Sequence, residues 1–339
     1  MQELLGRITA LDPEASHSLR VVACFDELMT GGVGQRGLLS AAAALAGRPV
    51  GFRWNAAGKT QLVGPDGTQL PFSEPTENKI ENAELTVWID HDGPATVNDK
   101  VILERLSLAL HLRLNGFTDP EKRDLAKLLD ASYTDSDRTN VATKLGLRTA
   151  DKYRVVVAPL FAHWAKHPSG IEDVIGTQFG PVHVVVCDSA SEFEGSPVGA
   201  SEATSLLGLC RAFQTALVCL RLVTASHPQV GAEDLGGLAE VLALTSTSNG
   251  SGPDEDAIRD LTEKHVWADG TLDALFAATS SREAARNAGV HHSTMAKRLE
   301  IISDRLGYLP MDGIGRARFT LAFLKYKLSK SQVFELPTL

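Results

Sequence analysis

The sequence lacks the features that mark membrane proteins and secreted, disulfide-rich proteins. No stretch approaches the roughly twenty apolar residues of a membrane span, and residues 1–14 mix acids with apolar residues, unlike a signal peptide. The four cysteines show neither metal-ligand spacing nor a dense framework: Cys24, Cys187, Cys210 and Cys219. We therefore expect a cytoplasmic protein, without a membrane partner, whose cysteines are buried thiols.

Two nucleotide-handling signatures are also absent. A phosphate-binding loop needs four residues between its glycines, whereas Gly51 and Gly58 have six between them and lie among expected strands. A nucleotide cyclase needs a Gly-Gly-Asp/Glu-Glu-Phe turn, whose carboxylates hold metal ions at the phosphates. The pairs at 31–32 and 236–237 lack the acids that should follow. The sequence therefore argues against an enzyme and predicts no cofactor.

Three histidines in the middle of the chain, His163, His167 and His183, lack the spacing of zinc ligands. We interpret them as ordinary core or surface residues. The sequence accordingly predicts no metal site.

The length of 339 residues suits two or three domains, and 43% hydrophobic with 22% charged residues describes a folded, soluble protein. Helices are predicted over 1–46, followed by strands at 49–54, 60–63 and 85–90. A helix over 98–114 is apolar on most sides, so we expect it in a core or against a partner.

The middle of the chain predicts a second mixture of helices and strands. Strands are expected over 145–160 and 181–188, the latter buried, and helices are expected over 121–131, 140–145, 202–223 and 234–244. Residues 245–256 are polar and rich in serine and glycine, which indicates a flexible linker.

Residues 281–302 are the most informative stretch, because they predict two helices joined by a tight turn. Ser280 or Ser281 is suited to cap the first helix, and Gly289 accepts the left-handed conformation that ends it. Apolar residues then recur at helical spacing, namely Met295, Leu299 and Ile302. The outward face of the second helix carries groups that hydrogen-bond phosphates or base edges, namely His291, His292, Ser293, Thr294, Lys297 and Arg298.

Charge distinguishes this region from an ordinary helical hairpin. Residues 281–330 hold ten lysines and arginines against four acidic residues, a net charge of +6, whereas the whole chain carries −9. Residues 251–280 hold two basic and seven acidic residues, a net charge of −5. A positive block on an acidic protein favours contact with phosphates, and we expect the acidic segment to face away from DNA.

The second helix of this stretch carries, in order, Val290, His291, Thr294, Arg298 and Leu299. In these residues it resembles the C-terminal helix-turn-helix of the PucR/CdaR family of bacterial transcriptional regulators. It departs from the family at His292 and Ser293, where arginine and asparagine are usual. Residues 312–328 resemble the closing helix of the same domain, with Arg316 in register. Upstream, 145–157 and 205–238 resemble the two ends of the family's central domain, a degenerate relative of the GGDEF cyclases.

The resemblance implies an α+β multidomain fold. Its parts are a GAF-like α/β sensor or dimerisation domain over 1–117, a degenerate GGDEF-like α/β domain over 118–250, and an all-α helix-turn-helix domain over 251–339. It also implies a non-enzymatic regulator that binds operator DNA as a homodimer or higher oligomer. The DNA contacts that follow are His291, His292, Ser293, Thr294, Lys297, Arg298 and Arg316.

Two questions stay open at this point. The first domain either binds a small-molecule effector, with Trp54, Trp88 and His91 lining the pocket, or is a structural domain in which these residues are core or surface. The alternative to a DNA-binding regulator is a ligand-sensing or protein-interaction scaffold whose helix-turn-helix has lost specific DNA binding.

Overall fold

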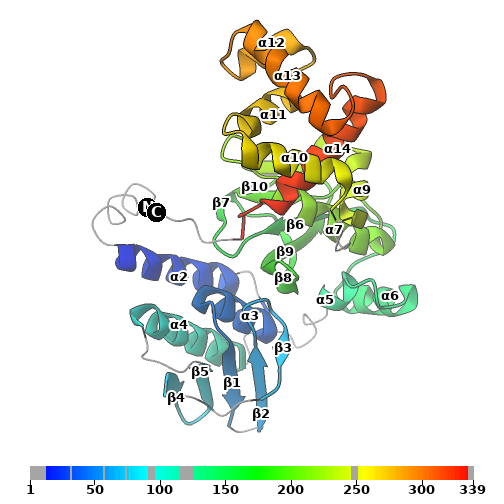
Figure 1. Cartoon of the computed structure of the whole chain (residues 1–339). Helices are drawn as coiled ribbons and strands as arrows, with labels where there is room; N and C mark the ends of the chain where they lie inside the picture. The colour runs from blue at the N-terminus through cyan, green and yellow to red at the C-terminus, as the bar shows by residue number, and fades with distance from the viewer. Residues whose placement is uncertain are drawn as a thin grey trace. The chain divides into compact units, whose positions relative to one another are not determined.

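The computed structural model describes residues 13–30, 33–55, 58–72, 75, 77–90, 96–114, 125–245 and 251–334. These residues form a mixed fold of sheets and helices with a helical C-terminal region (Figure 1), which confirms the predicted α+β multidomain class. The chain divides into two compact units, Met1–Asp234 with Val333–Leu339, and Leu235–Gln332. Among the described helices, none has the length and apolar character that a membrane crossing requires.

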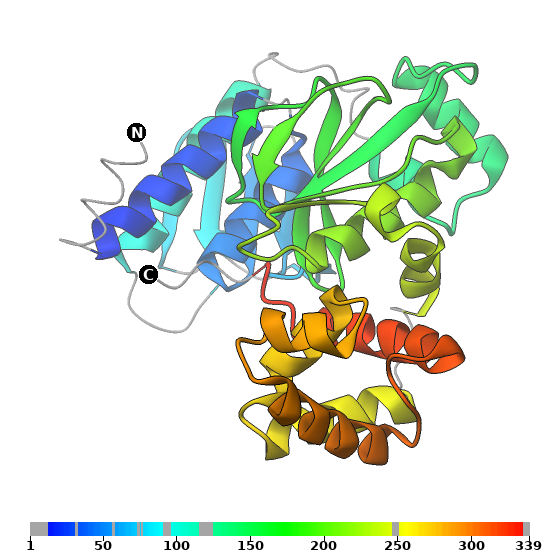
Figure 2. The same cartoon turned by 90° about the horizontal axis from the view of Figure 1, so that it is seen from above.

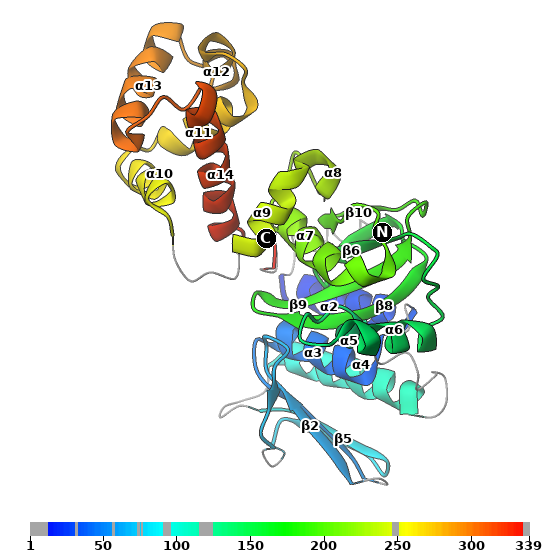
Figure 3. The ribbon, with the colours of Figure 1, turned by 90° about the vertical axis from the view of Figure 1, so that its right-hand side faces the viewer.

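The first sheet is antiparallel and has the strand order β3-β2-β1-β5-β4. Helices α2, α3 and α4 lie over one face of it (Figure 3), and the predicted strands correspond to β1, β2 and β5. The bounds are α2 Pro13–Thr30, α3 Gln35–Ala46, β1 Val50–Trp54, β2 Lys59–Val63, β3 Gln69–Leu70, β4 Lys79–Glu81, β5 Leu85–Ile89 and α4 Val97–Leu114. The alternating residues Leu85, Val87 and Ile89 of β5 point into the core beneath these helices.

The helix predicted over 98–114 is α4, but its burial differs from the expectation. One side packs in the core through Ile102, Leu106 and Leu110. The other side leaves Leu108 and Leu112 exposed, at 44% and 39% of their surface. The helix therefore has one buried face and one exposed face, on which Leu108 and Leu112 lie beside polar residues such as Glu104 and His111.

The second sheet has the order β12-β11-β6-β9-β8, antiparallel except for the β11–β12 pair, and a small sheet joins β10 to β7. The strand predicted over 145–160 is wrong before Tyr153, because residues 145–152 form turns, whereas 181–188 is confirmed as β9. The bounds are α5 Leu125–Leu128, α6 Asp135–Lys144, β6 Tyr153–Ala158, β7 His163–Lys166, β8 Gly170–Thr177, β9 Gly180–Asp188, β10 Glu194–Ser196, β11 Val198–Ala200, α7 Leu209–Arg221, β12 Gln229–Gly231 and α8 Ala232–Leu235.

Helix α3 connects the two sheets within the first unit. Val174 of β8 belongs to the same hydrophobic cluster as the helices over the first sheet. The backbone N–H of Gly34, which precedes α3, donates to the buried carboxylate of Asp173 at 3.2 Å. A carboxylate at a helix N-terminus is favoured by the helix dipole. The predicted first and second domains therefore belong to one compact unit, although each sheet has its own hydrophobic core.

The regular elements in the described part of the second unit are all helices. Figure 2 shows its helices, in yellow to red, packed around a common core. The bounds are α9 Gly237–Thr245, α10 Pro253–Lys264, α11 Ala268–Ala277, α12 Ser281–Asn287, α13 His292–Leu306 and α14 Gly313–Ser329. The linker predicted over 245–256 is shorter than expected, because α9 extends to Thr245 and α10 begins at Pro253.

A buried carboxylate, Asp99, ties the start of α4 to the end of α3. Asp99 is 1% exposed, accepts from the Thr96 backbone N–H at 2.9 Å and from Asn78 at 3.2 Å, and pairs with Arg48. Burial raises the pKa of Asp99, but the hydrogen bonds from Thr96 and Arg48 prevail and the pKa lies below its ordinary value. The folded state therefore favours the ionised form.

We expect Asp99→Asn to lower the free energy of unfolding by about 1–3 kcal/mol at neutral pH, because Arg48 loses its buried partner. A lowered folded-state pKa stabilises the protein above the unfolded pKa, and that stability is lost as the pH falls through the folded value. The difference from wild type should therefore shrink below about pH 4. Urea unfolding between pH 7 and pH 3 measures this, with the exposed Asp304→Asn as control. A difference that does not change with pH would contradict the assignment.

Candidate functional site

The pair α12–α13 forms the helix-turn-helix arrangement predicted for residues 281–302. Ser280 caps α12 by accepting from the backbone N–H of Glu283 at 3.3 Å. Gly289 has a φ of 64°, and its N–H donates to Arg286 O at 3.1 Å. The next residue, Val290, donates to Ala285 O at 2.9 Å. These two bonds satisfy the last carbonyls of α12 and turn the chain into α13.

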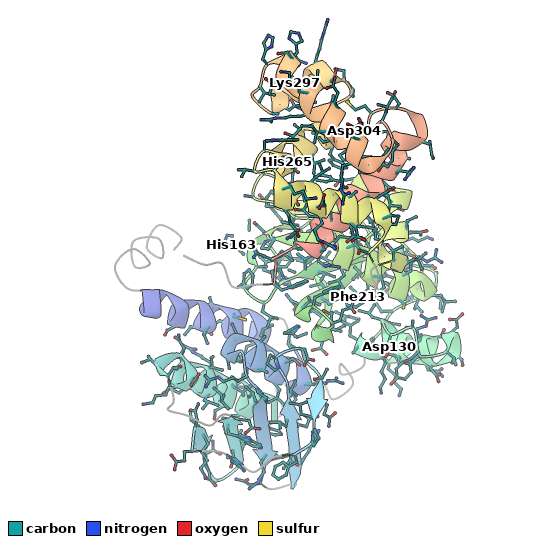
Figure 4. All side chains as sticks on the ribbon, in the orientation of Figure 1. Asp130, His163, Phe213, His265, Lys297 and Asp304 are labelled. Atoms are coloured by element: carbon teal, nitrogen blue, oxygen red, sulfur yellow. The ribbon has the colours of Figure 1, made fainter. Side chains whose placement is uncertain are left out.

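The two helices bury one side and expose the other. Ala285 of α12 is 3% exposed, and Met295 and Ile302 of α13 are fully buried in the core of the unit. Five predicted DNA-contact residues lie together at the exposed start of α13, namely His291, His292, Ser293, Thr294 and Lys297. Figure 4 labels Lys297 at the end of the unit that α12 and the first turns of α13 form. Because the apolar residues of α13 face the core, these polar and charged side chains point away from it.

The first turn of α13 leaves backbone donors at the surface. His291 is the N-cap residue; its Nδ1 lies 2.8 Å from the Ser293 hydroxyl and 3.4 Å from the Ser293 N–H. The His291 and His292 rings lie 4.1 Å apart, centre to centre. The N–H groups at the start of a helix carry partial positive charge; here the N–H of Thr294 also donates to His291 O at 3.0 Å, and that of Ser293 to His291 Nδ1. This end of α13 is therefore suited to an anionic group such as a phosphate.

Four of the ten basic side chains counted in residues 281–330 are neutralised within the unit itself. They pair with acidic side chains of α10 and α11, and the pairs are Arg305–Asp260, Arg318–Asp254, Lys325–Glu255, and Lys327 with Asp269 and Asp273. The acidic residues of α10 and α11, in the segment predicted to face away from DNA, thus form salt bridges to α13 and α14. The surplus of +6 is consequently not a uniform positive surface.

Arg298 is directed inward and not toward a ligand. Its Nη1 donates to the hydroxyl of Thr271 at 2.8 Å, and its guanidinium lies 5.0 Å from the centre of the Trp267 ring. The residue is half-buried. Arg298 therefore fastens α13 to α11, a role that differs from the DNA contact predicted for it.

Arg316 is likewise engaged by the protein. Its guanidinium donates to the carbonyl oxygens of Ala278 at 2.8 Å and Phe276 at 3.2 Å. These carbonyls lie at the C-terminal end of α11, where a cation complements the helix dipole. The arginine thus caps α11 from α14.

Three cations remain near the start of α13, and they are Arg282 and Arg286 of α12 and Lys297 of α13. All three are exposed, and none forms a salt bridge to another described residue. Arg286 lowers the pKa of Glu283, after the larger effect of the hydrogen bonds from Thr279. We call the positively charged surface of the unit the α12–α13 surface. It consists of these three cations together with His291, His292, Ser293 and Thr294.

The structure does not bring together the residues predicted to bind an effector. Trp54 pairs with Leu85 on the face of the first sheet that carries the helices. Trp88 pairs with Gly51 on the opposite face, where it is fully buried beside Phe72. His91 lies outside the described residues. Positions 51 and 54 of β1 differ by three, an odd number, so the alternation of side chains along the strand places the two tryptophans on different faces.

His167 and His183, interpreted from the sequence as ordinary core or surface residues, lie together on one carboxylate. Both rings meet the carboxylate of Glu172, at 3.3 Å from His167 Nε2 and 2.6 Å from His183 Nε2. Burial raises the pKa of Glu172, but the hydrogen bonds from the two histidines prevail and lower it to about 2. His163 is exposed and does not join them. Sequence spacing could not reveal the cluster, because the pairing of β8 with β9 creates it.

Comparisons with known proteins add little to this geometry. No protein-family model matches the chain, and no curated protein matches it. Among solved structures, the chain is similar to the crystal structure of a regulator of polyketide synthase expression from Bifidobacterium adolescentis. The identity is 17%, the TM-score is 0.29, and the match covers 64% of this chain and 96% of that chain. A similarity this weak supports no inference about function.

We expect Arg298→Ala to loosen the helical unit, because it removes a hydrogen bond to Thr271 and the contact with Trp267. The local stability of α11 and α13 should fall by about 1–2 kcal/mol, measured as faster hydrogen–deuterium exchange of their peptides. The neighbouring Lys297→Ala is the matched control and should change stability by less than about 0.5 kcal/mol. Equal exchange in the two variants would rule out the supporting role of Arg298.

Proposed function

We propose that this chain is a DNA-binding transcriptional regulator of the PucR/CdaR type, and that the α12–α13 surface contacts operator DNA. The observation that carries the proposal is the grouping of exposed hydrogen-bonding residues at the start of α13 beside three cations without salt bridges. In a helix-turn-helix, the start of the second helix is the part that reaches base edges in the major groove.

Each part of the α12–α13 surface has a distinct task in this proposal. Lys297, Arg282 and Arg286 neutralise phosphates, which supplies affinity but no sequence information. The side chains of His292, Ser293 and Thr294 reach base edges or phosphates from the first turn of α13. Arg298 and Arg316, which were predicted as DNA contacts, hold the helices in place instead.

The remainder of the chain sets the context for this surface. We assign residues 1–117 and 118–250 to a GAF-like and a degenerate GGDEF-like domain, consistent with the separate hydrophobic core under each sheet. We assign no catalytic activity, because the Gly-Gly-Asp/Glu-Glu-Phe turn that would hold metal-bound nucleotide is missing from the sequence. The helical domain follows from residue 251.

We expect Lys297→Ala to weaken binding to a duplex taken from the DNA upstream of this chain's own coding sequence. Loss of one phosphate contact should reduce the slope of log K against log salt concentration by about 0.9. Fluorescence anisotropy at several salt concentrations measures both quantities.

The matched control for this experiment is Lys264→Ala. Lys264 is also an exposed lysine of the helical unit, but it pairs with Asp260 on α10. Its removal should leave the salt slope unchanged. If Lys297→Ala and Lys264→Ala give the same affinity and slope as wild type, the α12–α13 surface does not bind DNA.

We further propose that the chain self-associates through the exposed side of α4. Leu108 and Leu112 lie one helical turn apart on this side, next to the half-buried Val101 and Arg105. Exposed leucines grouped on one helix face are typical of association surfaces. Two copies that pair there would present two helix-turn-helix units, as a pseudo-palindromic operator requires.

Replacing both leucines, Leu108→Glu with Leu112→Glu, should convert a dimer into a monomer at micromolar concentration, because the paired apolar surfaces are lost. Light scattering on the full chain measures the mass. Val266→Glu is the control, since Val266 is an exposed apolar residue of the helical unit. A monomeric wild-type protein would refute self-association, and equal effects of both changes would refute the role of α4.

A further inference from the structure

We propose that His167, Glu172 and His183 form a binding site for a divalent transition-metal ion, and that Zn²⁺ is the ion this ligand set suits best. The site lies in the first unit, on the second sheet, and is separate from the α12–α13 surface. Two histidines and one glutamate are a known combination of zinc ligands. Imidazole nitrogen and carboxylate oxygen also suit neighbouring first-row metals.

The fold brings the three ligands together from two strands and a loop. In the β8–β9 register Val174 faces His183, so Glu172, two residues earlier on β8, lies diagonally across from His183 on the same face. His167 precedes β8 in the loop that follows β7. The possible ligand atoms of all three side chains lie within 4.8 Å of one another.

The distances match what a small metal ion needs. Donor atoms bound to one tetrahedral ion at about 2.0–2.1 Å lie about 3.4 Å apart. His167 Nε2 is already 3.3 Å from Glu172 Oε2. His183 Nε2 is 2.6 Å from the same oxygen and would have to separate by less than about 1 Å.

The ring of His167 is oriented as that of a metal ligand usually is. Its Nδ1 lies 2.9 Å from the carbonyl oxygen of Pro168. A carbonyl oxygen accepts hydrogen bonds and cannot donate them, so Nδ1 carries the proton. A metal-bound histidine commonly donates its second ring nitrogen to a carbonyl in this way. Nε2 is then the nitrogen that faces Glu172 and His183.

Two of the three ligand side chains are buried, and the third is partly exposed to solvent. The side chains of His183 and Glu172 are 3% and 8% exposed, whereas His167 is 28% exposed. The Trp164 ring packs edge-on against both imidazoles, with ring centres 5.0 Å and 6.3 Å away. Once metal binding has released the Nε2 protons, two neutral imidazoles and one carboxylate provide a single negative charge. A divalent cation therefore enters past His167 and gains a buried counter-charge.

The test is metal binding by the full chain after its dialysis against a chelator. Titration with Co²⁺, which reports its coordination through its visible absorption, and with Zn²⁺ by calorimetry should give one site per chain. His167→Gln and Glu172→Gln should each weaken Zn²⁺ binding about tenfold or more. Circular dichroism shows whether the variants are folded.

Two controls separate this site from adventitious binding. His163→Gln removes an exposed histidine close by in sequence, and the double change of His291 and His292 to glutamine removes the adjacent pair on α13. Neither should alter the affinity. X-ray absorption of the Zn²⁺-loaded wild type should show two imidazoles and oxygen in the first shell, whatever the variants do. Absence of stoichiometric binding, loss of binding in a control, or a shell without two imidazoles would overturn the proposal.

Discussion

Ion pairing between acidic residues of α10–α11 and basic residues of α13–α14 is the interaction on which the helical unit depends. The partners are distant in sequence, as in Arg318–Asp254 and Lys327–Asp273, so each pair holds two helices together. Exposed pairs of this kind are individually weak, but a network with the inward contacts of Arg298 and Arg316 orients α13 firmly. The same pairing neutralises four of the ten cations in residues 281–330, whereas Arg282, Arg286 and Lys297, at α12 and the start of α13, form no salt bridge to another described residue. The ion pairs between α10–α11 and α13–α14 thus both join the helices and leave the unpaired cations on the α12–α13 surface.

The sequence predicts the local features of this arrangement well. The cap at Ser280, the left-handed Gly289 and the buried spacing of Met295 and Ile302 depend on neighbours within a few residues, and all are confirmed. The orientation of Arg298 could not be predicted in this way, because its partner Thr271 lies on another helix. A cation on a predicted surface helix has many possible partners, and spacing along one helix does not choose among them.

The same limit explains the two other differences between sequence and structure. Trp54 and Trp88 are both aromatic residues of adjacent strands, but only the strand register shows that they occupy opposite faces. His167, Glu172 and His183 have no recognisable spacing along the chain, and a two-residue diagonal between β8 and β9 assembles them. Strands are predictable from short apolar runs, whereas pairing partners and register depend on the whole sheet.

The turn and the first residues of α13 are the segment that we propose meets DNA. The most direct measurement is hydrogen–deuterium exchange of the full chain, with and without the upstream duplex, and with a scrambled duplex as reference. The start of α13 is exposed and carries the partial positive charge of a helix N-terminus, so phosphate or base contact should slow the exchange of the backbone N–H groups of residues 288–294. The account predicts protection concentrated in 281–298 and stronger with the upstream duplex. Bound DNA that leaves this segment unprotected would contradict it.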